Sequence, residues 1–260
     1  MKVYKFGGAS IKDARGIRNL AQIVTKTNDV ILVVVSAIGK TTNALEGVAE
    51  LHHAIMDDLN LNSYNRLYDA IVSQGELMST RIVSEYLSSQ GIDNVWLDAR
   101  QILVSDDTYR AANIDMVKTG QNIRKAIQSH PSRLYIIQGF IAGTQDGQPT
   151  TLGREGSDYS AAIFANLLDA ESVTIWKDVP GILTADPRKQ SDATLIKELN
   201  YEDAAVLAAS GAQIIHSKTI APLAEKRIPL YVKPFLNPDA DGSVIHASAP
   251  KLNIPVAWKK

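Results

Sequence analysis

The chain has 260 residues, of which 45% are hydrophobic and 21% are charged, and its formal net charge is −1. Such a length allows a sizeable core, built as one large domain or two small lobes. The near-neutral charge gives no support for nucleic-acid binding, which usually needs a basic excess. The longest aliphatic run, residues 30–35, is too short for a membrane span, and the N-terminus lacks a secretory signal. No cysteine is present, so disulfides and thiolate chemistry are excluded, and a cytoplasmic location is expected.

The first half of the chain alternates strand and helix signals. Residues 3–6 predict a strand that ends in two glycines, and apolar residues at helical spacing predict a helix over residues 13–26. The β-branched run at residues 30–36 predicts a strand buried on both faces, as in a parallel sheet. Helices are expected to run through residues 45–51, over residues 63–87 and over residues 114–127, with a strand at residues 94–97.

The second half continues the alternation. Residues 134–140 predict a central strand, and the turn-rich segment 143–147 predicts a hairpin that leads back to Thr150. An apolar helix is expected over residues 161–168, with Ser157 as its N-cap. A strand at residues 172–176, helices at 202–209 and 219–226, and a last strand at 229–232 complete the pattern. The alternation favours an α/β fold with a mostly parallel sheet, and any seam between lobes is expected near residues 169–171.

A polar, glycine-containing segment at residues 150–161, TTLGREGSDYSA, joins the predicted hairpin to the apolar helix. Gly153 and Gly156 allow the backbone to curve tightly, and the start of the helix offers unpaired N–H groups to an anion. Arg154 adds a planar cation suited to carboxylate or phosphate, and Asp158 adds a carboxylate at the same turn. The segment indicates a site for charged small molecules, and an ordinary strand-to-helix loop is the alternative.

Two other predicted strands end in glycine-rich turns. Lys5 is followed by Gly7 and Gly8, and the second turn runs from Ser36 to residue 43. In open α/β sheets, ligands bind beyond the carboxyl ends of the strands. The Gly-Lys-Thr in the second turn is not a P-loop, because Val34 stands where that motif needs glycine. The first turn likewise lacks the spacing of a dinucleotide fingerprint.

Six segments carry a resemblance when they are taken together in order. The chain resembles the aspartokinase branch of the amino-acid kinase family from residue 2 to about residue 245. The matching segments are KFGGAS, VVVSAIGKTTNAL, SQGELMSTRIV, QGF with TTLGREGSDYSAA, WKDVPGILTADPR, and SGAQIIHSKTIAPLAEKRIPLYVK.

The resemblance implies a three-layer α/β/α sandwich and a specific phosphoryl transfer. Residues 1–170 would form the amino-acid-binding lobe and residues 171–250 the nucleotide-binding lobe. The reaction transfers the γ-phosphoryl group of ATP, with Mg²⁺, to the side-chain carboxylate of L-aspartate. The product is 4-phospho-L-aspartate, the first intermediate towards lysine, threonine and methionine. No base is needed, because the attacking carboxylate is already ionised near neutral pH.

The resemblance also assigns roles to individual residues. Lys5 would neutralise the transferring phosphoryl group, Gly7, Gly8 and the Ser36 loop would donate N–H groups to it, and Asp158 would orient this machinery. The positions that match the aspartate site are Ser36, Thr42, Glu76, Phe140, Arg154 and Ser157, with Arg154 suited to the α-carboxylate and Glu76 to the α-ammonium group. The positions that match the nucleotide site are Lys177, Asp178, Leu183, Arg188 and Gln213. No residue is expected to ligate a metal directly, and none of the five histidines is assigned chemistry.

Three positions depart from the family pattern and leave alternatives open. Ala9 replaces a threonine, Glu155 a glycine and Gln213 a common lysine. One alternative is a relative that phosphorylates another acceptor, such as glutamate, N-acetylglutamate, carbamate or a nucleoside monophosphate. Another is a weakly active homologue that acts as a regulatory subunit. The sequence ends at Lys260 without a regulatory ACT domain, so insensitivity to lysine and threonine is expected, with any homodimer formed through the kinase domain.

Overall fold

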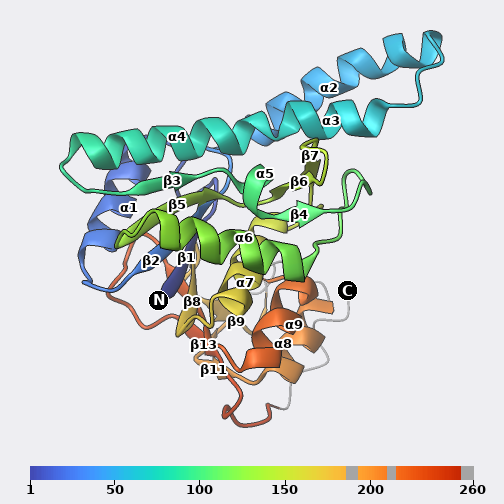
Figure 1. Cartoon of the computed structure of the whole chain (residues 1–260). Helices are drawn as coiled ribbons and strands as arrows, with labels where there is room; N and C mark the ends of the chain where they lie inside the picture. The colour runs from blue at the N-terminus through green and yellow to red at the C-terminus, as the bar shows by residue number, and fades with distance from the viewer. Residues whose placement is uncertain (186–192, 210–214, 253–260) are drawn as a thin grey trace.

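The structure is a computed structural model that describes residues 1–185, 193–209 and 215–252, and an eight-stranded sheet lies at its centre (Figure 1). The strand order is β11-β13-β12-β8-β1-β2-β5-β3. Neighbouring strands pair in parallel except β12 and β13, which are antiparallel. The strands are β1 (Lys2–Phe6), β2 (Ile31–Val35), β3 (Val95–Leu97), β5 (Leu134–Gln138), β8 (Ser172–Lys177), β11 (Glu198–Leu199), β12 (Leu230–Pro234) and β13 (Ser243–Ile245).

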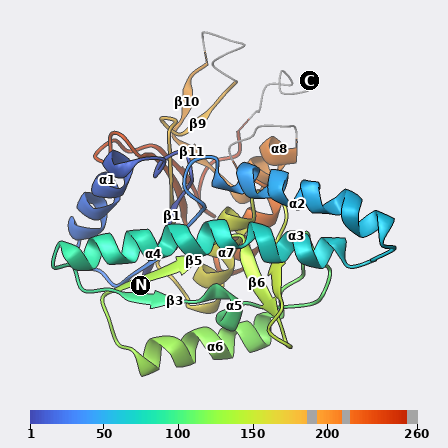
Figure 2. The ribbon, with the colours of Figure 1, turned by 90° about the horizontal axis from the view of Figure 1, so that it is seen from above.

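Helices cover both faces of this sheet, which confirms the predicted three-layer α/β/α sandwich (Figures 1 and 2). Strand β2 shows how the layers arise. Val33 and Val35 join the core against α1 (Ala14–Thr25) and α4 (Gln74–Ser89), whereas Leu32 and Val34 join the opposite core. Successive side chains of a strand point to opposite faces, so a continuous apolar strand serves two cores. The opposite layer contains α6 (Met116–Ser129), α7 (Gly156–Leu167), α8 (Tyr201–Ala209) and α9 (Ser217–Lys226).

Local side chains explain where several helices begin. Asp13 caps α1 by accepting a hydrogen bond from the Gly16 N–H at 2.9 Å, and Asp115 caps α6 through the Lys118 N–H at 2.9 Å. The predicted N-cap of α7 is wrong. Glu155 occupies the cap position with φ 56°, and Ser157 lies inside the first turn. A bend through the left-handed region starts this helix two residues earlier than a serine cap would.

Two helices form an arm beside the sheet. Helix α2 (Thr41–Asp58) packs along α3 (Tyr64–Val72), and both project past the end of the sheet in Figure 2. The single helix expected over residues 63–87 is wrong, because Ser73 separates α3 from α4. The Ser73 hydroxyl donates to the Ala70 carbonyl at 3.1 Å, and such local bonds compete with the regular helical pattern.

The remaining strands are short. The predicted hairpin is confirmed as β6 (Ile141–Thr144) and β7 (Pro149–Thr151), and β4 (Val104–Ser105) pairs with β6 after the short helix α5 (Ala99–Ile102). Strand β9 (Ile182–Leu183) pairs with β10 (Leu195–Ile196). The expectation that residues 229–232 form the last strand is wrong, since β13 follows and pairs with β12. No helix in the described part of the chain is long and apolar enough to cross a membrane.

Candidate active site

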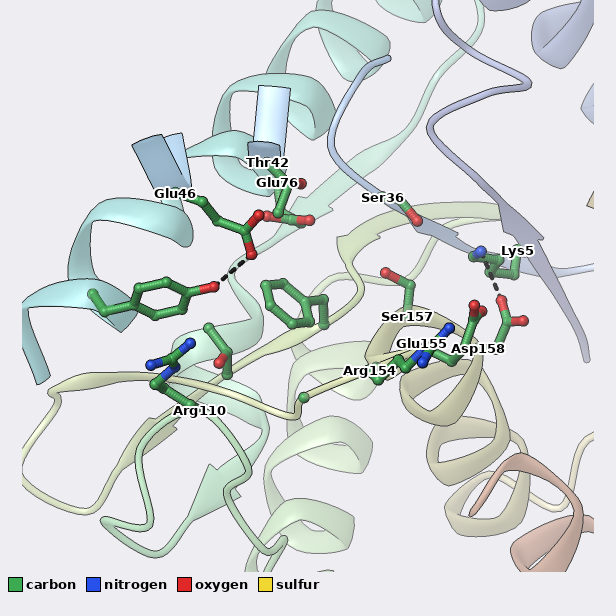
Figure 3. A pocket seen from close by; sticks show the side chains of 15 residues that line it. Lys5, Ser36, Thr42, Glu46, Glu76, Arg110, Arg154, Glu155, Ser157 and Asp158 are labelled. Atoms are coloured by element: carbon green, nitrogen blue, oxygen red, sulfur yellow. Dashed lines mark hydrogen bonds and ion pairs between the residues drawn. The ribbon is translucent and has the colours of Figure 1, made fainter. Parts of the chain in front are cut away.

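A cavity of about 480 Å³ lies at the carboxyl ends of the central parallel strands. Lys5 comes from β1, Ser36 follows β2, and Phe140 follows β5. The start of α7 lines the same space next to Lys5 (Figure 3). Eight of the sequence-predicted residues line it, namely Lys5, Ser36, Thr42, Glu76, Phe140, Arg154, Ser157 and Asp158.

Asp158 is the electrostatic centre of the cavity. Its carboxylate is completely buried, with Oδ1 2.6 Å from Lys5 Nζ and Oδ2 3.3 Å from Lys177 Nζ. Burial by itself would raise the pKa of Asp158, but the charges and hydrogen bonds of Lys5 and Lys177 together hold that pKa below its ordinary value. The carboxylate therefore stays ionised and holds two ammonium groups at fixed positions. Strands β1 and β8 are neighbours in the sheet, which places both lysines beside one acid.

Glu76 provides a second buried acid in the first turn of α4. Its Oε1 accepts a hydrogen bond from the Ala37 N–H at 3.2 Å, whereas Oε2 has no hydrogen-bond partner among the described residues. Burial raises the pKa of Glu76 to about 7, against the opposing effects of the Ala37 N–H and the Lys5 charge. A buried carboxylate oxygen without a partner favours a cationic ligand group at this position.

The glycine-rich turn after β1 lies against the turn after β2. The Gly8 carbonyl accepts from the Gly39 N–H at 3.0 Å, and a Cβ at Gly8 would lie 2.3 Å from the Ala37 carbonyl oxygen. Only glycine permits this close approach. Gly7 lies beside the Lys5 ammonium group, since a Cβ there would be 3.3 Å from Lys5 Nζ. Neither glycine is among the residues that line the cavity.

Glu155 sits at the lip of the cavity in a conformation that suits glycine. Its φ is 56° and its side chain is exposed, next to the exposed Arg154 (Figure 3). The left-handed region is unfavourable for residues with a Cβ. Gly156, the next residue, packs so closely on Phe140 that an added Cβ would lie 2.8 Å from the ring. At the cavity, Glu155 therefore has a strained backbone, and the start of α7 packs closely against Phe140 at Gly156.

Four more residues line the cavity, and two of them, Glu46 and Arg110, lie at its end away from Lys5 (Figure 3). Glu46, Tyr68, Arg110 and Thr151 line it as well. Asp69, which is buried next to Tyr68, holds this side together by accepting from the Arg110 N–H at 2.9 Å, the Thr151 N–H at 2.8 Å and the Thr151 hydroxyl at 2.8 Å. Glu46, Tyr68 and Arg110 come from helices and a loop far apart in the sequence, so no local motif marks them, whereas Thr151 lies within the glycine-containing segment 150–161.

A second cavity of about 390 Å³ lies between the loop after β8 and the loop after β12. Lys177 and Asp178, two of the residues assigned to the nucleotide from the sequence, line this cavity. Leu183 is buried in β9 and is not one of its lining residues. Arg188 and Gln213 lie outside the described residues. Lys177 connects the two cavities, because it lines the second one and forms an ion pair with Asp158 in the first.

Comparison with known proteins identifies the family. The model of the amino acid kinase family matches residues 1–234. This chain belongs to the amino acid kinase family. Within the family it is 34% identical over 286 residues to lysine-sensitive aspartokinase 3 of Escherichia coli, covering 94% of this chain and 63% of that protein. It is also 32% identical to the chloroplastic bifunctional aspartokinase/homoserine dehydrogenase 2 of Arabidopsis thaliana, covering 94% of this chain and 32% of that protein.

Solved structures of amino acid kinases agree with this assignment. E. coli aspartokinase III in complex with aspartate and ADP superposes with a TM-score of 0.86 at 32% identity, covering 96% of this chain and 65% of that one. UMP kinase from Ureaplasma parvum, at 18% identity and a TM-score of 0.61, shares the fold alone. The chain therefore spans less than two thirds of the aspartokinases that it matches.

Proposed function

We propose that this chain is an aspartate kinase that transfers the γ-phosphoryl group of ATP to the side-chain carboxylate of L-aspartate. The observation that carries the proposal is the Lys5–Asp158–Lys177 arrangement, which opens into a cavity that also contains Glu76 and Arg154. The R-state structure of E. coli aspartokinase III, which binds aspartate and ADP, supports this choice of substrates.

The proposed mechanism depends on positioning and charge, as phosphoryl transfer generally does. Lys5 neutralises the oxygens of the transferring group, and Asp158 positions Lys5 and Lys177 through the two ion pairs. The aspartate side-chain carboxylate attacks the γ-phosphorus atom, the bond to the bridging oxygen breaks, and ADP leaves with that oxygen and its electron pair. Gly7 and Gly8 are assigned N–H donation to the phosphoryl group.

The substrate amino acid is proposed to lie between α4 and the start of α7. Glu76 accepts hydrogen bonds from the α-ammonium group through its unpartnered oxygen, and Arg154 pairs with the α-carboxylate. Thr42, Ser157 and Phe140 line the space between them. A substrate ammonium group beside Glu76 favours the ionised carboxylate, so binding should lower the pKa of Glu76 from about 7.

The nucleotide is proposed to extend from Lys177 into the second cavity, beside Asp178. In this arrangement residues 1–170 hold the amino acid and residues 171–250 hold ATP. Leu183, Arg188 and Gln213 keep their assignment to the nucleotide as predictions from the sequence. A homodimer through the kinase domain is a further prediction, which light scattering of the purified chain can test.

Mg²⁺ is proposed to enter with ATP. No group of three or more His, Cys, Asp or Glu side chains suited to a metal ion occurs among residues 1–185, 193–209 and 215–252. Mg²⁺ does not need such a group, because it is usually bound by substrate phosphates and water with only one or two carboxylates. Asp158 is a buried carboxylate beside Lys5, the residue proposed to contact the phosphoryl group, and it is already paired with two lysines. When bound, the ion would neutralise charge on the phosphate oxygens.

A coupled assay of ADP release tests the proposal with L-aspartate, glutamate, N-acetylglutamate, carbamate and nucleoside monophosphates. We expect turnover with L-aspartate, lost in Lys5→Ala and Asp158→Ala variants that retain the circular dichroism of the folded chain. Preference for another acceptor would overturn the choice of substrate. No turnover by the pure chain, restored by a second subunit, would instead identify a regulatory homologue.

A further inference from the structure

Helix α4 holds the loop that follows β2 through two of its side chains. Glu76 Oε1 accepts a hydrogen bond from the Ala37 N–H at 3.2 Å, and Ser79 Oγ accepts one from the Ile38 N–H at 2.8 Å. The Ser79 hydroxyl donates its own proton to the Gly75 carbonyl at 2.6 Å, which fixes its orientation. Both side chains are only 2% exposed, so water competes little for these bonds.

The same loop contacts the glycine turn after β1 on its other side. The Gly39 N–H donates to the Gly8 carbonyl at 3.0 Å. The Ala37 carbonyl oxygen lies so close to Gly8 that a Cβ there would be 2.3 Å from it. Gly8 follows Gly7, which lies beside the Lys5 ammonium group. The position of α4 therefore determines, through this loop, where the glycine turn lies relative to Lys5.

The loop is fixed along its whole length. A Cβ at Gly75 would lie 3.0 Å from the Cβ of Ala37, so α4 approaches the loop closely. The Ser36 N–H donates to the Phe6 carbonyl at 3.1 Å, and with this bond the N–H groups of all four residues 36–39 have acceptors within the chain. The resemblance assigns N–H donation to this loop as well as to the glycines. The geometry instead makes the loop a support for the glycine turn, whose N–H groups are proposed to contact the phosphoryl group.

We infer that Ser79 is a positioning residue for phosphoryl transfer, which acts through the loop at residues 36–39 on the glycine turn beside Lys5. The inference rests on the proposed function. Ser79 is not among the residues that line the cavity, so it acts without touching a substrate. Glu76 shares this role, because its Oε1 holds the same loop while its Oε2 is left for the substrate ammonium group. The competing explanation is that Ser79 only stabilises the packing of α4 on β2.

Kinetics of a Ser79→Ala variant of the full chain test the inference. The variant removes the acceptor of the Ile38 N–H, so the loop and the glycine turn should leave the geometry needed for in-line transfer. We expect kcat to fall by roughly tenfold, and the single-turnover rate with it, because small misplacements of reacting groups slow such reactions strongly. The KM for aspartate should stay within about threefold, because Glu76 and Arg154 remain in place.

Two further substitutions at the same position grade the effect. Ser79→Thr keeps the hydroxyl, and a threonine hydroxyl in a helix can bond the carbonyl of the preceding turn, as Thr80 does with Glu76 at 2.9 Å. It should keep kcat within about threefold of the parent chain. Ser79→Cys has a weaker acceptor of similar size, so its kcat should lie between those of the parent and Ser79→Ala.

A matched control lies on the same helix. The Ser84 hydroxyl donates to Asn94 Oδ1 at 2.6 Å, and neither residue lines the cavity. Ser84→Ala therefore removes a similar hydrogen bond that does not involve the loop, and it should leave kcat and KM within about twofold. The melting temperature reports the fold of each variant, and hydrogen exchange of the Ile38 N–H reports the loop itself.

The outcomes separate positioning from packing and from the activity. Faster exchange at Ile38 with a lowered kcat in Ser79→Ala, restored in Ser79→Thr, would support the inference. A parent-like kcat in Ser79→Ala, at any melting temperature, or equal losses in the alanine and threonine variants would overturn it and leave the proposed function intact. A raised KM for aspartate with an unchanged kcat would also overturn it. No ADP release by the parent chain with any acceptor would refute the proposed function itself.

Discussion

The pKa of Glu76 predicts that aspartate binding depends on pH in the neutral range. The carboxyl has a pKa of about 7 in the unliganded chain, and the proposed ammonium contact requires its ionised form. The apparent dissociation constant then scales as one plus the ratio of protonated to ionised carboxyl, which is about 11 at pH 6 and about 1.1 at pH 8. The KM for aspartate should accordingly fall about tenfold between these values, since neither carboxyl of aspartate titrates there.

The raised pKa of Glu76 also makes the stability of the fold depend on pH. The folded-state pKa lies above the ordinary value of 4.5, so the folded chain binds more protons than the unfolded chain between pH 4.5 and 7. The free energy of unfolding therefore decreases by about 3 kcal/mol as the pH rises from 4.5 to 7, because of Glu76 alone. Above pH 7 the contribution of Glu76 no longer changes with pH. Glu76→Gln should remove that part of the pH dependence in urea unfolding.

Steady-state kinetics from pH 6 to pH 8 at saturating ATP provide the assay. Calorimetry in buffers of different ionisation enthalpy should show release of about half a proton when aspartate binds at pH 7. Glu76→Gln is the matched control, with a raised KM that no longer varies with pH. A parent KM that is flat across this range, or a Glu76→Gln variant with the parent pH profile, would refute the reasoning.

Three further changes test other parts of the site. Lys5→Met should reduce kcat by about 10²–10³-fold, because the charge on the transferring phosphoryl group is no longer neutralised. It should also destabilise the fold by about 3 kcal/mol, because Asp158 loses one of its two ammonium partners. A urea midpoint equal to that of the parent chain would argue against the buried ion pair. Asp69→Asn should cost about 2 kcal/mol in urea unfolding, because the buried carboxylate accepts three hydrogen bonds, and a cost below about 0.5 kcal/mol would contradict this. Glu155→Gly should stabilise the fold by about 1 kcal/mol, because the backbone strain at φ 56° is relieved, and should lower the KM for aspartate, because a carboxylate next to Arg154 is removed. A lower melting temperature would show that this backbone is not strained.

The order of strands and helices was predictable from local chemistry. Apolar periodicity in the chain located β1, β2, β5, β8 and β12 closely, because buried parallel strands need continuous β-branched or aliphatic runs. Polar turns directly after these runs indicated the ligand-binding edge of the sheet. Asp158 could be placed in the first turn of a helix, because it directly precedes an apolar helical segment. The break at Ser73 and the cap at Glu155 were missed, because both depend on backbone angles that residue types do not fix.

The residues that complete the candidate site were decided only by tertiary structure. The pairing of β1 with β8 brings Lys5 and Lys177 to one carboxylate, and no spacing in the sequence predicts which strands become neighbours. Tyr68 and Arg110 meet because a buried acid, Asp69, draws a distant loop onto α3. Sequence patterns report the environment of each residue within a few turns along the chain. Contacts between distant segments arise from the packing of the whole fold, so they were absent from every local pattern.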